Sequence, residues 1–306
     1  MKLLIIGDPK EEGIGKVVSK EARKFFTKVL YVPINRIRLE VSDDIRVFYE
    51  NEDLGSYDGV LPMPTMENAE FFYLVTRMLE KNVVYTPIPS DVILLPWNKP
   101  LLSYTLRKNG IKIRKVFAIA QNVAASTIMN EIKFPVFITT PSGRRVLVTK
   151  EEVLKDVLNL FKAGNMITIE KPIKATSVVW SFVVGDEVIA SYEKSEEKGR
   201  RAIRLDKELE EISIKIREIL KSDFCVLSFV KTKNETVLSN VSFSPDYKVF
   251  NEVTGINTIS LLLSYLAEKL YEEKKGMLNK FVDSVKGILG WLLNEVSNLR
   301  SVKQRV

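Results

Sequence analysis

The sequence predicts a mixed protein, in which an N-terminal α/β layer is followed by two α+β subdomains. Three observations lead to this prediction. Strand and helix signals alternate over residues 1–90, two apolar hairpin patterns with polar turns span 177–194 and 224–243, and amphipathic helices lie between the remaining strands. The chain of 306 residues, 45% hydrophobic and 28% charged, has room for about two domains with a sizeable core.

The N-terminal layer, residues 1–95, is predicted to hold a mostly parallel sheet. Its short apolar runs predict strands at 2–6, 29–33, 59–63 and 83–86. Apolar residues recurring at helical spacing predict helices at 15–27 and 66–81.

Two α+β subdomains are expected at 96–165 and 166–270. The first is predicted to contain helices 100–109, 122–132 and 151–163, and strands 112–119, 135–140 and 145–149. The second is predicted to contain strand 166–170, strand pairs 177–184 with 187–194 and 224–230 with 236–243, and helices 205–220 and 255–270. Gly185-Asp186 suits the tight turn of the first pair.

Residues 271–306 form a fourth region with a strong amphipathic pattern. Leu278, Val285, Leu292 and Leu299 recur every seven residues. This pattern predicts an extra C-terminal amphipathic helix, although Gly287 and Gly290 each weaken it by about 1 kcal/mol. Three roles stay open for helix 274–300: packing on its own domain, self-association or binding a protein partner, and lying on a membrane surface.

Composition excludes several kinds of chemistry. The chain has no histidine and one cysteine, so it cannot build a Ser-His-Asp triad, an imidazole metal site or an internal disulfide. Any metal would need oxygen ligands, as Mg²⁺ and Ca²⁺ do. No apolar run is long enough to span a membrane, no signal peptide is expected at the start, and the single cysteine favours a cytoplasmic location. Abundant Lys and Glu are typical of thermophilic proteins.

The pair of strands at 224–230 and 236–243 carries polar residues that alternation predicts to share one face: Asn240 and Ser242, with Ser228 able to join them. The segment Asn240-Val241-Ser242-Phe243-Ser244-Pro245 resembles the end of the metal-binding hairpin of RimK-like ATP-grasp ligases, which join amino acids to carboxylates. The resemblance extends in order over residues 1–270 and implies the ATP-grasp fold. It also implies Mg-ATP as the cofactor wherever ligase activity is retained.

The family's metal-ligating carboxylates correspond to neutral residues here. The positions that match the family's ligands are Ser228, Asn240 and Ser242. Hydroxyl and amide oxygens bring no charge to offset Mg²⁺, so no metal is expected. The resemblance therefore implies a ligase scaffold that lacks its metal-ligating residues.

Several positions match the family's nucleotide-binding residues. Lys99 matches a lysine that lies on the phosphate side of the nucleotide in the family, and Thr139 stands where the family has another lysine. Glu170 matches the acidic residue of the hinge that binds adenine. Gly143 and Arg144 lie in a shortened form of the glycine-rich loop, and Arg144 or its neighbour Arg145 can supply charge there. Trp180 replaces an arginine, and we expect Trp180 and Phe243 to fill part of the nucleotide site.

Three functions remain open. The preferred one is a degenerate ATP-grasp protein that acts as a binding, scaffold or regulatory module. The second is an active ATP-dependent carboxylate–amine ligase whose metal ligands have moved to Asp246, Asp223 or Glu170. The third is a polyanion-binding protein that uses Arg200, Arg201 and Arg204; the net charge of +7 permits it, but without a groove motif a nucleic-acid partner is not expected.

Overall fold

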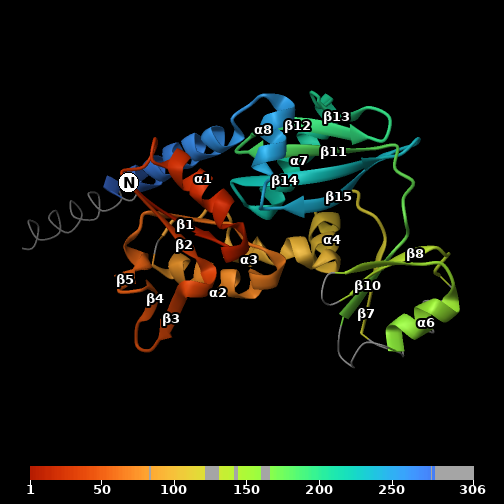
Figure 1. Ribbon diagram of the computed structural model, residues 1–306, viewed down its shortest axis with the longest axis horizontal. Coiled ribbons are helices and arrows are strands. Elements are labelled where there is room, and N and C mark those ends of the chain that lie inside the picture. The colour runs from red at the N-terminus through yellow and green to blue at the C-terminus, as the bar shows by residue number, and fades with distance from the viewer. Residues whose placement is uncertain (83, 121–130, 141–143, 160–165, 277, 280–306) are drawn as a thin grey trace, which may run out of the picture.

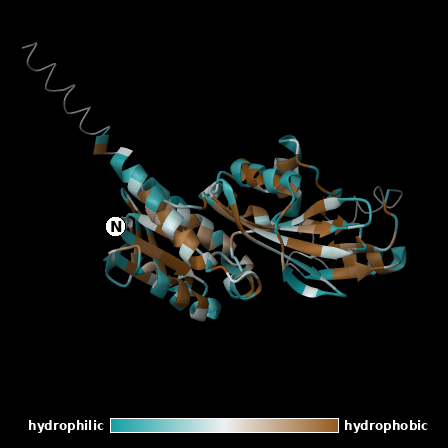
Figure 2. Ribbon diagram, turned by 90° about the horizontal axis from the view of Figure 1, so that it is seen from above, coloured by the Kyte–Doolittle hydropathy of each residue, from teal (hydrophilic) through white to brown (hydrophobic). Residues whose placement is uncertain are grey.

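The structure, a computed structural model, describes residues 1–82, 84–120, 131–140, 144–159, 166–276 and 278–279. The described residues form three main sheets and a small three-stranded sheet (Figure 1). In Figure 2 the hydrophobic residues lie mainly along the strands, and the outer turns and helix faces are hydrophilic. The predicted mixture of α/β and α+β architecture is confirmed.

The N-terminal layer has a parallel three-stranded sheet in the order β2-β1-β6. Its central strand is almost fully buried, as its unbroken apolar run predicts. The elements of this layer are β1 Lys2–Gly7, α1 Glu12–Ala22, β2 Lys28–Pro33, β6 Gly59–Pro62, α2 Ala69–Lys81 and α3 Ser90–Ile93.

An antiparallel sheet, missing from the sequence prediction, is attached to this layer. It is formed by β3 Ile37–Val41, β4 Ile45–Tyr49 and β5 Glu52–Asp53. The predicted strand at 83–86 is wrong for the residues described, since only Tyr85 makes an isolated bridge, to Gly59. The chain there is a connector, and the hydrogen bonds of β6 run mainly to β1.

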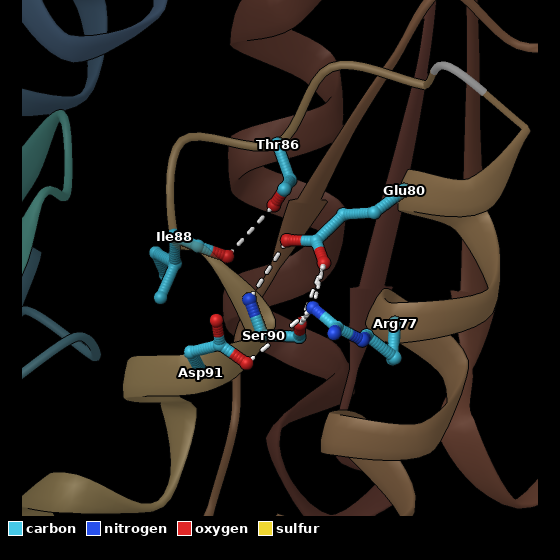
Figure 3. A network of polar contacts seen from close by, with 6 residues as sticks. All are labelled: Arg77, Glu80, Thr86, Ile88, Ser90 and Asp91. Atoms are coloured by element: carbon cyan, nitrogen blue, oxygen red, sulfur yellow. Dashed lines mark hydrogen bonds and ion pairs between the residues drawn. The ribbon is translucent and has the colours of Figure 1, made fainter.

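That connector is fixed by a polar network at the end of α2 (Figure 3). The Glu80 carboxylate accepts hydrogen bonds from the backbone N–H of Ser90 at 2.8 Å and from its hydroxyl at 2.5 Å. Arg77 lies 3.7 Å from Glu80 and 3.4 Å from Asp91, in the first turn of α3. These contacts hold the chain between the N-terminal layer and the segment that supplies Lys99.

The smallest subdomain is an antiparallel sheet in the order β7-β10-β8-β9. Its core, which includes Ile138, Leu154 and Ile167, is separate from that of the rest of the protein. Its elements, with the helix that leads into it, are α4 Lys99–Lys108, β7 Val116–Ala120, β8 Val136–Thr139, β9 Arg145–Val148, α6 Glu151–Asn159 and β10 Met166–Glu170. The helix expected at 122–132 lies almost wholly outside the described residues.

The largest sheet is antiparallel, in the order β13-β12-β11-β14-β15. It shares one continuous core with the N-terminal layer, so the two form a common body. Its elements are β11 Ser177–Val184, β12 Glu187–Ser195, β13 Gly199–Ala202, α7 Lys207–Leu220, β14 Phe224–Lys231, β15 Thr236–Ser242 and α8 Tyr247–Thr254. The two predicted hairpins are confirmed; β13 and α8 were not predicted.

A final helix covers residues 258–276. It buries Leu262, Leu263 and Leu266 against the common core, but residues 271–276 and Leu278 are exposed. Most of the predicted tail helix, residues 280–306, lies outside the described residues. Within the part that is described, no helix is long and apolar enough to cross a membrane.

Candidate functional site

The three positions that match the family's metal ligands lie close together on the largest sheet. Strand register places Trp180 of β11 beside Ser228 of β14, and Ser228 beside Asn240 of β15. Ser242 follows two residues later on the same face, where burial alternates as predicted: Val241 is buried, and Asn240 is exposed. The predicted sharing of a face by Ser228, Asn240 and Ser242 is confirmed.

These side chains line a cavity of about 330 Å³. Its wall is partly aromatic, because the rings of Trp180 and Tyr192 stack with centroids 4.9 Å apart and Tyr192 packs edge-on against Phe250 of α8 at 5.0 Å. The cavity is lined by Trp180, Tyr192, Val226, Ser228, Asn240, Ser242, Ser244, Asp246 and Phe250. Trp180 therefore lines the cavity at the positions that match the family's metal ligands, and its place in a nucleotide site stays a prediction.

Phe243 does not share the cavity, and that part of the prediction is wrong. Its side chain is 2% exposed and belongs to the core on the other face of β15. Alternation explains the difference, because consecutive residues of a strand point to opposite faces and Ser242 already faces the cavity.

The oxygen atoms that could bind a metal ion in this cavity do not fit an ordinary Mg²⁺ site. The Ser242 hydroxyl already accepts a hydrogen bond from the Ser244 N–H at 3.0 Å. Asp246 is the only carboxylate among the described residues that line the cavity, and it caps α8 by accepting from the Val249 N–H at 3.1 Å. No group of three or more metal-ligating Asp, Glu, Cys or His side chains occurs anywhere in the described parts of the chain. Mg²⁺ is usually held by one or two carboxylates together with nucleotide phosphates, and the single carboxylate here is already engaged in capping α8.

Glu170, at the end of β10, is the centre of a second cluster. Its carboxylate is 4% exposed and lies 2.6 Å from the Lys99 ammonium, at the start of α4. Arg114 approaches it at 3.7 Å and Arg145 at 3.6 Å. Three cations thus surround one buried carboxylate, which leaves an excess of positive charge.

Burial dominates the electrostatics of this cluster. It lowers the pKa of Lys99 below its ordinary value, with Glu170 opposing that shift and the two arginines adding to it. Burial likewise lowers the pKa of Arg114, again opposed by Glu170. The cluster keeps a net positive charge, because Glu170 balances only one of its three cations.

Other predicted nucleotide residues lie around this cluster with different roles. Thr139 of β8 pairs with Thr168 of β10 and with Arg145 of β9. The backbone N–H of Arg144 donates to the Thr140 hydroxyl at 3.1 Å. Arg145, and not Arg144, reaches Glu170. Gly143 lies outside the described residues.

The structure adds two residues that sequence reasoning missed, Arg114 and Tyr192. Arg114 is distant in sequence from Glu170, and its N–H also donates to the Lys171 carbonyl at 3.1 Å. No local motif marked it. Tyr192 lies opposite Trp180 because a β-bulge between Phe182 and Val183 shifts the register by one residue. The regular register of the predicted hairpin would place Ser191 there, so the sequence alone did not point to Tyr192.

Two of the three proposed relocated metal ligands are engaged elsewhere. Asp223 accepts hydrogen bonds from the hydroxyls of Tyr85 and Tyr265, where the N-terminal layer meets the largest sheet. Glu170 is held by its three cations. Asp246 alone lines the cavity with Asn240.

The arginines considered for polyanion binding do not form one free basic patch. Arg201 pairs with Glu193 at 2.6 Å. Arg204 borders a different cavity, between β12 and α7, together with Glu210. These arrangements fit a solvated, partly neutralised surface.

Comparisons with known sequences agree on one family. The family profile of the RimK-like ATP-grasp domain matches residues 98–266. The "Probable alpha-L-glutamate ligase" of Haemophilus influenzae (strain PittEE) is 19% identical over 259 residues, covering 76% of this chain and 87% of that protein. The "Alpha-aminoadipate--LysW ligase LysX" of Saccharolobus solfataricus is 25% identical over 218 residues, covering 64% and 79%.

Solved structures show the same fold. A RimK domain ATP-grasp protein from Sphaerobacter thermophilus superposes with a TM-score of 0.69 at 14% identity, covering 87% of this chain and 99% of that one. A D-alanine–D-alanine ligase from Bacillus anthracis, complexed with ATP, gives 0.66 at 17% identity, covering 90% and 99%. The predicted ATP-grasp fold is confirmed.

Proposed function

This chain belongs to the RimK-like ATP-grasp family, and we propose that it acts as a binding module of that family without carrying out ligase chemistry. The observation that carries the proposal is the cavity formed by Ser228, Asn240 and Ser242. The side chains at the family's metal-ligating positions are neutral, and the stacked rings of Trp180 and Tyr192 occupy space beside them.

Energetics support the same proposal. A ligase of this kind activates a carboxylate with a phosphoryl group, and it depends on neutralising phosphate charge. Loss of one well-placed electrostatic group costs about 10²–10³ in rate, and several such losses combine without simple addition. The lysine that stands at Thr139 in the family and the carboxylates at the metal positions are all replaced here. Lys99, Arg114 and Arg145 carry three positive charges, and Glu170 balances one of them. The other two remain available to an anion.

Calorimetric titration with ATP, with and without Mg²⁺, tests the proposal. We expect a dissociation constant weaker than about 10 μM in both titrations and no gain in affinity on adding Mg²⁺, because the cavity offers the ion little charge. A magnesium-dependent dissociation constant of about 10 μM or tighter would remove the main support for the proposal.

A second candidate function is ATP-dependent ligation of a carboxylate to an amine. Two findings favour it: Asp246 lines the same cavity as Asn240, and the matched relatives carry ligase names. In that case Asp246→Asn should abolish ADP release. An Asp246→Asn protein that releases ADP as fast as the unaltered chain would rule this assignment out.

We propose that residues 274–300, which carry the amphipathic pattern, form the contact with a second copy of the chain or with another protein. The helix that leads into it is already exposed from residue 271, with Leu278 62% exposed. Because Val285 and Leu292 belong to the apolar repeat, Val285→Asp with Leu292→Asp should lower the mass measured by light scattering if copies associate. Lys286→Gln is the control on the polar side. An unchanged mass for both variants would exclude self-association as the role of this segment.

A further inference from the structure

A second cavity, of about 570 Å³, lies on the N-terminal layer, between α1 and the edge strand β2. Four cations line it against a single carboxylate: Lys16, Lys20, Arg23 and Arg36 against Glu12. Lys16 pairs with Glu12 at 2.8 Å. Lys20, Arg23 and Arg36 form no ion pair with any residue that the structure describes, so their charge is available to a ligand.

The floor of this cavity holds a buried hydroxyl that lacks a hydrogen-bond partner. Ser19 of α1 is 8% exposed, and its Oγ makes no hydrogen bond within the described parts of the chain. Leaving a buried polar group unpaired is costly, and most buried polar groups in proteins are paired. The Oγ is covered from water, so a ligand oxygen could accept from it only after the Ser19 side chain turned toward the cavity. Such a hydrogen bond would remove the cost of leaving the hydroxyl unpaired.

Two half-buried aromatic rings, Tyr31 and Tyr49, complete the wall. The Tyr31 ring packs so closely beneath α1 that a Cβ on Gly15 would lie 2.1 Å from it. Its hydroxyl donates to the Asp8 carbonyl at 3.3 Å. Packing and this hydrogen bond therefore hold the ring in place, as a platform on which a planar group can stack.

We propose that this cavity binds a small phosphate monoester carried on an aromatic ring. The three unpaired cations exceed the charge of a phosphate dianion by one, Ser19 supplies a donor once its side chain turns toward the cavity, and the tyrosines contact the ring. The volume lies in the range of ordinary small-molecule sites. The site is on the N-terminal layer, so its occupation is separate from that of the Trp180 cavity.

The test uses phenyl phosphate as the probe and the full chain labelled with ¹⁵N. We expect saturable shifts of backbone amides in α1 and β2, with a dissociation constant of about 1 mM or tighter. Inorganic phosphate and phenol should each bind more weakly than phenyl phosphate, since each offers only half of the contacts. Shifts spread evenly over the surface, or no saturation, would overturn the proposal.

Matched variants separate a built site from general surface charge. Arg23→Gln with Arg36→Gln should weaken binding by about tenfold or more, because both lose charge-assisted contacts. Lys24→Gln also removes a positive charge, but Lys24 pairs with Glu21 and does not line the cavity. This control variant should leave binding unchanged. Equal weakening by Lys24→Gln would contradict the site.

Ser19→Ala gives a second, independent readout. It should weaken binding several-fold while leaving the thermal midpoint unchanged or higher, because it deletes an unpaired buried hydroxyl. An unchanged affinity for phenyl phosphate, whatever the thermal midpoint, would refute the part of Ser19 in the site.

Discussion

Replacing Glu170 by glutamine should lower the free energy of unfolding by about 3 kcal/mol. The substitution leaves Lys99 and Arg114, whose side chains are 23% and 15% exposed, without their counter-charge and close to Arg145. Removal of one partner from a buried ion pair is costly because the remaining charge stays desolvated. Chemical denaturation of the two proteins measures the difference.

The matched control is Glu235→Gln. Glu235 pairs with Lys112 at a similar distance, 2.7 Å, but the two side chains are 46% and 80% exposed. An exposed pair contributes little, so this variant should change stability by about 0.5 kcal/mol or less. Equal losses in both variants would show that burial of the Glu170 cluster has no energetic consequence.

The same cluster gives a pH dependence. Because burial lowers the pKa of Lys99, the folded protein gives up this proton at lower pH than the unfolded chain does. Between the two pKa values the unfolded chain binds more protons, so this lysine's contribution to stability rises with pH. Glu170→Gln removes the charge that opposes the shift, so the alkaline interval over which stability rises should widen.

Restoring the family's ligands should restore a response to magnesium. The triple variant Ser228→Asp, Asn240→Glu and Ser242→Asn places two carboxylates and an amide at adjacent positions on β14 and β15. None of the three original side chains is fully buried, so the new charges remain in contact with water. We expect Mg²⁺ to tighten ATP binding by at least tenfold in this variant and to leave the unaltered chain unaffected.

A neutral variant provides the control for that experiment. Ser228→Asn with Asn240→Gln changes the size of the side chains at two of these positions without adding charge. If it gained the same magnesium response as the triple variant, shape and not charge would explain the effect. If neither responded, the position of Trp180, and not the missing carboxylates alone, would limit the site.

The shared face of Asn240 and Ser242 was predictable because it depends only on the two-residue period of a strand. Ser228 joins that face through a β-bulge between Ser228 and Phe229, which aligns it with Asn240 and which no local pattern marked. The family resemblance also predicted Lys99 and Glu170, which contact each other directly. Arg114 was not predictable, since its approach to Glu170 depends on how the chain turns between α4 and β7. Gly143 and most of the tail lie outside the described residues, so their predicted roles remain predictions.

Two missed elements had local signals that were too short to recognise. Helix α8 spans only Tyr247–Thr254 and is fixed by the Asp246 cap and by burial of Phe250, neither of which produces a long periodic pattern. The β3–β4 hairpin alternates apolar and charged residues, but its strands are five residues each and mostly exposed. Tertiary packing, more than local preference, selects such elements.

The most direct test of the central claim is ADP release by the unaltered protein in the presence of ATP, Mg²⁺ and a mixture of amino acids. If the cavity beside Trp180, with neutral residues at the family's metal positions, cannot support phosphoryl transfer, release should equal that of a protein-free control. Magnesium-dependent release at about 1 s⁻¹ or faster, a normal rate for an enzyme, would contradict the proposed loss of ligase chemistry.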